Sequence, residues 1–219
     1  MLYLTYGVKR YISPCFFAWY TIPIKKKGDT IVQTEPIRDR NKLRQFAAHY
    51  LQRGQFRNYV LIILGVHTAL RISDLLRLTW DDVYDETTGD FRTHITVTEK
   101  KTGKQKTIAL NHKAVAALRL LHPHRRGAFI FANNRKQPAP ISRVQAWRII
   151  KAAAVAVGLL GRIACHSLRK TFGYFAWKSG VLPVMLMELF NHSSFEITRR
   201  YLGVAQDDRD KVYLELALF

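Results

Sequence analysis

Cysteine is scarce in this sequence, and its scarcity limits the kinds of site that the chain can build. Cys15 and Cys165 are the only two cysteines among 219 residues, and no CxxC motif occurs. The eight histidines show no metal-ligand spacing either. These features predict no bound metal, and the default setting for such a chain is a reduced cytoplasm.

Long uninterrupted apolar runs are also lacking. The run from Tyr11 to Ile24 is too short to span a bilayer as a helix, and Pro14 and Pro23 interrupt it. Basic residues flank it, but no small-residue cleavage site follows, so it does not fit a signal peptide. We interpret residues 1–34 as an N-terminal extension of unknown role.

Acidic residues are few compared with basic ones. The chain has 16 Asp and Glu against 35 Lys and Arg, which gives a formal net charge of +19 and a pI near 10.2. An excess of this size indicates a polyanionic partner, nucleic acid first and an anionic membrane surface second. Hydrophobic residues make up 48% of the chain, enough for one sizeable folded core.

What the sequence does contain is a succession of helical patterns. Apolar residues recur at helical spacing along most of the chain, while residues 91–97 and 108–110 alternate as the two strands of a hairpin. The sequence therefore predicts a mainly α fold with a small β-hairpin, of the α+β class. A short apolar strand is also expected at 129–131. The expected helices cover residues 43–51, 59–66, 73–78, 111–121, 142–157 and 167–179, with two more that begin at Pro183 and Ser193.

Polar residues mark the ends of several of these helices. The expected N-caps are Ser73, Asn111, Ser142 and Ser193, the last of which is spaced with Glu196 as a capping box. Asn191 is expected to end the helix that Pro183 begins, because asparagine tolerates the left-handed conformation common after a helix.

Basic side chains gather in the hairpin turn and on the helix over 142–157. Most such residues are simply solvated, but with this net charge they are candidate contacts to DNA phosphates. The expected DNA contacts are Lys100, Lys104, Arg143, Arg148, Lys151 and Lys170.

Six further residues form a set suited to handling a phosphodiester. They are, in chain order, Arg71, Lys101, His166, Arg169, His192 and Tyr201. Arginine forks match phosphate oxygens, and histidine and lysine can move protons. A tyrosine oxygen can attack phosphorus to form a covalent intermediate. Taken singly, His192 and Tyr201 are more often core residues, and it is the combination that favours catalysis.

The strings around these residues resemble a known family. ALRISDLLRLTW, HSLRKTFG and NHSSFEITRRYLG are similar to the three conserved boxes of the tyrosine recombinase, or phage integrase, family, in family order and spacing. The resemblance covers roughly Glu35 to the C-terminus and implies a catalytic domain over residues 35–219. It also implies the short type that lacks an N-terminal core-binding domain. One departure is Asn191, where most members have glycine.

The resemblance implies a role for each residue of the set. Tyr201 would be the nucleophile that forms a 3′-phosphotyrosyl link, and the lysine of the hairpin would protonate the leaving 5′ oxygen. Lys101 is favoured for this role, with Lys100 and Lys104 as rivals. Asp74 would support the site by orienting a catalytic group. The stored bond energy means that neither a metal nor ATP nor any other cofactor is required.

The implied partners are double-stranded DNA and other copies of the chain. The resemblance suggests a homo-tetramer on DNA that exchanges the C-terminal tail, residues 206–219, and an accessory DNA-bending protein. The tail would form a last helix capped by Asp207 or Asp208. Alternatives are a type IB-like enzyme that only relaxes supercoiled DNA, a non-catalytic DNA-binding regulator on the same scaffold and, more distantly, a membrane-surface protein.

Overall fold

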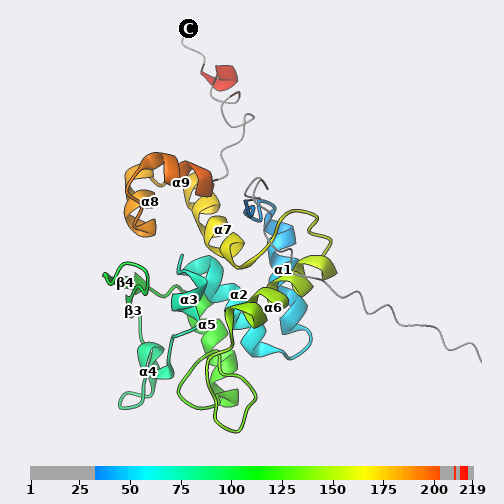
Figure 1. Ribbon diagram of the computed structural model, residues 1–219, viewed down its shortest axis with the longest axis vertical. Coiled ribbons are helices and arrows are strands. Elements are labelled where there is room, and N and C mark those ends of the chain that lie inside the picture. The colour runs from blue at the N-terminus through cyan, green and yellow to red at the C-terminus, as the bar shows by residue number, and fades with distance from the viewer. Residues whose placement is uncertain (1–32, 203–209, 211–212, 217–219) are drawn as a thin grey trace, which may run out of the picture. The chain divides into compact units, whose positions relative to one another are not determined.

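The computed structural model describes residues 33–202, 210 and 213–216 of the chain (Figure 1). The expected N-terminal extension, apart from its last two residues, lies outside the described part. Within that part the chain forms nine α-helices, one 3-10 helix and two small antiparallel sheets. The prediction of a mainly helical fold with a small hairpin is therefore confirmed.

In chain order the elements are α1 (Arg40–Leu51), α2 (Phe56–His67), α3 (Ile72–Leu75), α4 (Trp80–Val83), β1 (Tyr84–Asp85), β2 (Asp90–Phe91), β3 (His94–Thr98), β4 (Gln105–Ala109), α5 (His112–Leu121), η1 (His122–His124), α6 (Arg143–Ala156), α7 (Cys165–Lys178), α8 (Pro183–Phe190) and α9 (Phe195–Leu202). The order of the elements differs from the expected one only in short elements such as α4, β1, β2 and η1.

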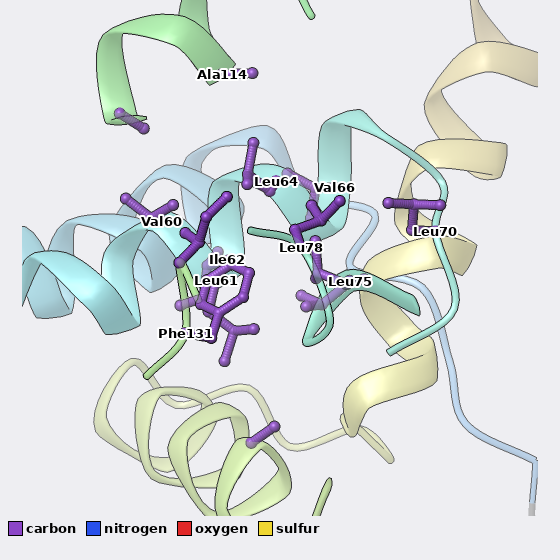
Figure 2. Close-up of a cluster of buried hydrophobic side chains, with 14 of the residues drawn as sticks. Val60, Leu61, Ile62, Leu64, Val66, Leu70, Leu75, Leu78, Ala114 and Phe131 are labelled. Atoms are coloured by element: carbon purple, nitrogen blue, oxygen red, sulfur yellow. The ribbon is translucent and has the colours of Figure 1, made fainter. Parts of the chain in front are cut away.

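Helix α2 is central to the core because it is apolar on nearly all sides. It contacts α1, α5, α6 and α7. Figure 2 shows its side chains Val60, Leu61, Ile62 and Leu64 gathered with Phe131 and with leucines from the segment that follows α2. Burial on several faces stabilises this helix far more than its own propensity does.

A left-handed residue turns the chain after α2. Ala69 has a φ of 56°, a conformation that costs energy for a residue with a Cβ. Leu70, which follows it, is buried and holds the turn in place. The turn delivers Arg71 to the position immediately before α3.

Three predicted helix ends are confirmed. Asn111 Oδ1 accepts a hydrogen bond from the Ala114 N–H at 3.0 Å, and Ser142 Oγ accepts one from the Gln145 N–H at 3.1 Å. Asn191 adopts the left-handed conformation, with φ 50° and ψ 52°, directly after α8. Each of these depends on local backbone geometry, which is why the sequence reveals it.

Three local predictions are wrong. Helix α3 begins one residue before Ser73, with Arg71 at its cap position. Ser194, not Ser193, accepts the N–H of Ile197 at the start of α9. Residues 129–131 form no strand and contribute only an isolated bridge between Phe129 and Thr79. Their apolar character reflects burial in the core rather than pairing in a sheet.

The predicted hairpin is formed by β3 and β4. Ile95 pairs with Ile108 and Val97 with Lys106, and the two strands bury Ile95, Val97 and Ile108 on one face. Phe91 belongs instead to a separate two-residue pairing of β1 with β2. The lysine-rich turn between β3 and β4 lies at the end of the hairpin, as expected.

Candidate active site

The structure brings His166, Arg169, His192 and Tyr201 together from three helical segments. His166 lies in the first turn of α7, His192 follows α8, and Tyr201 lies near the end of α9. The His166 Nε2 and the Tyr201 hydroxyl form a hydrogen bond. The ring centroids of His192 and Tyr201 are 4.5 Å apart, and the Arg169 guanidinium carbon is 5.9 Å from the tyrosine ring centroid. Helices α7, α8 and α9 pack against one another, which fixes this arrangement (Figure 1).

Arg169 is the most deeply buried cation of the site, with 1% of its surface exposed. Its guanidinium donates hydrogen bonds to the carbonyls of Ala69 and Phe190, while its Nε has no hydrogen-bond partner among the residues that the structure describes. Burial, and then the nearby Arg71, lower the pKa of Arg169 to about 10. It therefore stays charged at neutral pH.

Arg71 supplies a second guanidinium to the site, close enough to act on the charges of Arg169, His192 and Tyr201. Its side chain is 18% exposed, and its Nη1 lies 2.7 Å from Oε2 of Glu99 in an ion pair. Two arginines in one partly buried site repel each other, so the site favours an anion placed between them. A phosphate is the anion that guanidinium groups match in shape.

Both histidines of the site are neutral at physiological pH. Burial, reinforced by Arg169, lowers the pKa of His166 and of His192 to about 4. His192 Nδ1 lies 3.0 Å from Thr198 Oγ1, and its ring stacks on Phe190. A neutral imidazole has one free lone pair, so His166 can accept a proton.

Tyr201 is protonated under the same conditions. Burial raises the pKa of its hydroxyl, and Arg169 and Arg71 lower it only in part. The oxygen is therefore a weak nucleophile until a base removes its proton. The basic group in contact with this hydroxyl is the His166 imidazole.

The lysines of the hairpin turn are exposed. Lys104 Nζ lies 3.4 Å from Asn191 Oδ1, and the Lys100 N–H donates to Asp74 Oδ1 at 3.1 Å. Lys101 lies in the turn between Lys100 and Thr102. Asp74 is buried and contacts the backbone of this turn, so it orients the hairpin.

Two site residues escaped the sequence reasoning. Glu99 is 2% exposed and forms the ion pair with Arg71. Lys106 is half-buried, and its ammonium donates to the Leu189 carbonyl at the end of α8. A signal for Glu99 was present, because it continues the inward alternation of Ile95 and Val97.

The expected DNA contacts lie in different environments. Arg143 and Arg148 are exposed on α6, and Lys151 on the same helix is half-buried. Lys170 is 5% exposed, and its ammonium donates to the Thr34 carbonyl at 2.7 Å. The expectation for Lys170 is therefore corrected: it is an internal residue that ties the start of the unit to α7.

Two further observations concern the described residues only. They contain no group of three or more histidine, cysteine, aspartate or glutamate side chains arranged to hold a metal ion. No helix among them is long and apolar enough to cross a membrane.

Comparisons with known proteins agree with this geometry. The phage integrase family matches residues 38–207. The probable integrase/recombinase YoeC of Bacillus subtilis is 35% identical over 180 residues, which cover 82% of this chain and 94% of that protein. The tyrosine recombinase XerD of Mycobacterium tuberculosis is 29% identical over 154 residues, covering 66% of this chain but 47% of XerD. The chain thus spans about half the length of that relative.

Solved structures show the same fold. The crystal structure of XerA recombinase has a TM-score of 0.66 and 18% identity, covering 84% of this chain and 66% of XerA. That of the XerH site-specific recombinase has a TM-score of 0.68 and 18% identity, covering 90% of this chain and 56% of XerH. With the three sequence boxes, the assembled site and the family match in agreement, the chain belongs to the phage integrase family of tyrosine recombinases.

Proposed function

We propose that this protein is a site-specific DNA recombinase that cleaves and rejoins DNA strands through a 3′-phosphotyrosyl intermediate. The observation that supports this best is the hydrogen bond between His166 and Tyr201 beside two arginines. A neutral base, a protonated tyrosine and concentrated positive charge are the parts that phosphoryl transfer to a tyrosine requires.

Each residue of the site then has a role in the first step. His166 takes the proton of Tyr201, and the freed oxygen attacks the scissile phosphorus. Arg71, Arg169 and His192 hold the non-bridging oxygens and the charge that builds on them, usually the largest contribution to such catalysis. Lys101 gives its proton to the 5′ oxygen as the bond from phosphorus to that oxygen breaks. A 5′ hydroxyl of another strand reverses the step, so no cofactor is consumed.

Double-stranded DNA is the proposed substrate. The net charge of +19 and the exposed Arg143 and Arg148 suit a polyanion. Among the structural relatives, XerH was solved bound to its difH substrate and a lambda integrase dimer was solved bound to a core site. We assign catalysis to residues 35–219 as a whole and expect an accessory DNA-bending protein to assist.

We further propose that the protein assembles on DNA by exchanging its C-terminal tail between copies. The predicted cap residues Asp207 and Asp208 lie outside the described residues. Tyr213, Leu214 and Leu216 are described and are 83%, 84% and 63% exposed. Exposed apolar side chains of this size are costly in water, at roughly 25 cal/mol for each Å².

A groove on the same unit suits such a tail. It lies between α1, α2 and α7, has a volume of about 680 Å³ and is lined by apolar side chains that include Phe172 and Phe175. Arg40, Arg44 and Lys113 also line it. Residues 206–219 carry four acidic and two basic residues, the reverse of the chain as a whole. Apolar fit and charge complementarity therefore both favour this tail as the occupant of the groove, and we propose that it comes from a second copy.

The decisive experiment is a trapping assay. Purified protein is incubated with a nicked duplex that carries a candidate site, and a denaturing gel is read for a covalent protein–DNA adduct. The wild type should give the adduct, and Tyr201→Phe should give none while it folds and binds DNA normally. An adduct at normal yield in that variant moves the nucleophile elsewhere, and Tyr174→Phe and Tyr213→Phe test the nearest tyrosines.

The same preparation separates the alternatives. A recombinase joins two different duplexes, a relaxing enzyme only removes supercoils, and a non-catalytic regulator binds without forming an adduct. Truncation after Asp208 tests the tail. The shortened protein should remain folded and bind DNA but assemble and recombine poorly. If it instead aggregates or melts much earlier, the tail belongs to its own core and the exchange proposal is wrong.

A further inference from the structure

Glu99 is a buried carboxylate at a place where negative charge works against the binding of a phosphate. It continues the inward face of β3 after Ile95 and Val97, and only 2% of it is exposed. Carboxylates are almost never buried to this extent without partners. Its presence beside Arg71, in a site built for an anion, therefore needs an explanation other than phosphate binding.

Three segments of the chain converge on this carboxylate. Arg71, at the start of α3, lies 2.7 Å from its Oε2. The Thr102 hydroxyl, from the hairpin turn, donates to the same oxygen at 2.8 Å. The Asn191 side-chain amide, from the end of α8, donates to it at 3.2 Å. Glu99 thus joins the arginine segment, the lysine turn and the residue before His192.

These contacts keep Glu99 ionised. Burial alone raises the pKa of its carboxyl, but the hydrogen bonds of Arg71, Thr102 and Asn191 outweigh burial and lower that pKa to about 2. The carboxylate is an anion at any pH at which the enzyme would work. Its charge offsets part of the repulsion between Arg71 and Arg169.

Other bonds tie the same turn on both sides of Lys101. Before it, the Lys100 N–H donates to Asp74. After it, Lys104 contacts Asn191, and Lys106 donates to the Leu189 carbonyl. The backbone that carries Lys101 is therefore held at several points. Among these points, the Glu99 carboxylate is buried and also contacts Arg71 of the site.

We propose that Glu99 is a positioning residue that holds the turn bearing Lys101 against Arg71, so that the lysine reaches the leaving 5′ oxygen. The inference rests on the proposed function and deepens it. In the step concerned, the Tyr201 oxygen bonds to phosphorus and the bond from phosphorus to the 5′ oxygen breaks. The proton that the 5′ oxygen needs comes from Lys101.

A change of leaving group tests this directly. In a duplex with sulfur in place of the scissile 5′ oxygen, the departing thiolate needs no proton, so the reaction no longer depends on the general acid. General acid–base catalysis contributes typically 10²–10⁴-fold. Glu99→Ala should therefore slow cleavage of the ordinary duplex by about 10²-fold and restore a near wild-type rate on the sulfur-containing duplex. Lys101→Ala should follow the same pattern.

Two controls keep the outcomes distinct. Arg71→Ala should be slow on both duplexes, because phosphate stabilisation is needed whatever group leaves. Glu99→Gln keeps the shape of the side chain without its charge, should fold even if Glu99→Ala does not, and should show the same pattern with a smaller defect. DNA binding and thermal melting are measured for every variant.

Each other result overturns the inference. If the Glu99 variants are equally slow on both duplexes, the carboxylate acts through Arg71 or the fold and does not position the lysine. If they are normal on both, Glu99 has no part in cleavage. A wild-type protein that forms no adduct with either duplex defeats the proposed function itself, which is a different failure.

Discussion

The residues of the site are supported by two clusters of buried side chains, one large and one small, and the two clusters support different residues. The large cluster spans residues 37–168 and includes Leu70 and Leu168, the immediate neighbours of Arg71 and Arg169. The small cluster consists of Ala69, Leu186, Phe190 and Leu202, with Tyr201 packed against it. Arg71 is therefore anchored in the main core, whereas Arg169 joins the two clusters through its hydrogen bonds to the carbonyls of Ala69 and Phe190. Tyr201 depends on far less buried surface.

The helix that supports the small cluster is also poorly covered. In α8 and the residue before it, Leu182, Val184 and Met185 are 71%, 75% and 49% exposed. Segments with few buried apolar contacts open at lower free energy than the core. The comparison indicates that the segment with His192 and Tyr201 is held less firmly than Arg71, and that Arg169 is one of its ties to the rest of the fold through the Phe190 carbonyl.

The largest effect is expected from the arginines. Arg71→Ala and Arg169→Ala should each lower the rate of cleavage of bound DNA by about 10²–10³-fold, the usual cost of losing one preorganised donor to the transition state. Affinity should change little, since many other cations share that work. Single-turnover cleavage and binding at several salt concentrations measure both quantities.

An exposed arginine of α6 serves as the matched control. Arg148→Ala should weaken DNA binding, because one phosphate contact is lost, and should lower the slope of log affinity against log salt concentration by about one unit. Cleavage of the bound DNA should remain normal. Equal losses of cleavage and affinity in the Arg71 and Arg169 variants would make them ordinary backbone contacts. The comparison between the firmly held arginines and the weakly buried segment of Tyr201 would then say nothing about catalysis.

The sequence predicts those features that depend on local rules. Caps such as Asn111 and the left-handed Asn191 follow from backbone geometry within a few residues, and the hairpin follows from alternation. The candidate catalytic set could be proposed because its spacing matched a family. Even so, the pattern alone could not show that His166 contacts Tyr201, which lies 35 residues further along the chain.

What escaped prediction depends on contacts between distant segments. Lys170 was expected to face DNA, but its ammonium donates a hydrogen bond inside the protein to the carbonyl of Thr34, 136 residues away. Glu99 was overlooked since a charged residue at a strand end normally faces solvent, and only the fold places Arg71 beside it. In both cases the charged group lies inside the protein because a partner from a distant segment satisfies it there. Sequence periodicity does not reveal that partner.

Two glycines offer a matched pair for separating the clusters. A Cβ on Gly65 would lie 2.4 Å from Leu168 Cδ1 and 3.1 Å from its Cβ, inside the large cluster. A Cβ on Gly173 would lie 2.8 Å from Cζ of Phe190, the centre of the small cluster. Both glycines lie within helices, so alanine brings a similar gain in helix propensity at each, about 1 kcal/mol.

The two alanine variants should fail in different ways. Gly65→Ala forces α2 and α7 apart and should lower the free energy of unfolding by about 1–3 kcal/mol. Gly173→Ala tilts Phe190, whose ring stacks on His192 and lies 5.4 Å from that of Tyr201. Misplacing catalytic groups costs up to about 10²-fold in rate, so cleavage should fall more than stability. Urea unfolding measures stability, and the rate of adduct formation measures cleavage. If Gly65→Ala mainly slows cleavage and Gly173→Ala mainly lowers stability, the comparison of the two clusters is wrong.

The last prediction is a dependence of stability on pH that comes from the two site histidines. Their pKa is lowered from 6.5 to about 4 in the folded protein, so between these values the unfolded chain binds more protons than the folded one. Stability must then rise with pH across this window and be lost as pH falls from 6.5 towards 4. Glu99, whose pKa is lowered from 4.5 to about 2, loses its contribution only below the window. His166→Asn and His192→Asn should each flatten the slope of unfolding free energy against pH. If neither site variant alters the slope, burial does not lower the pKa of either histidine in the folded protein.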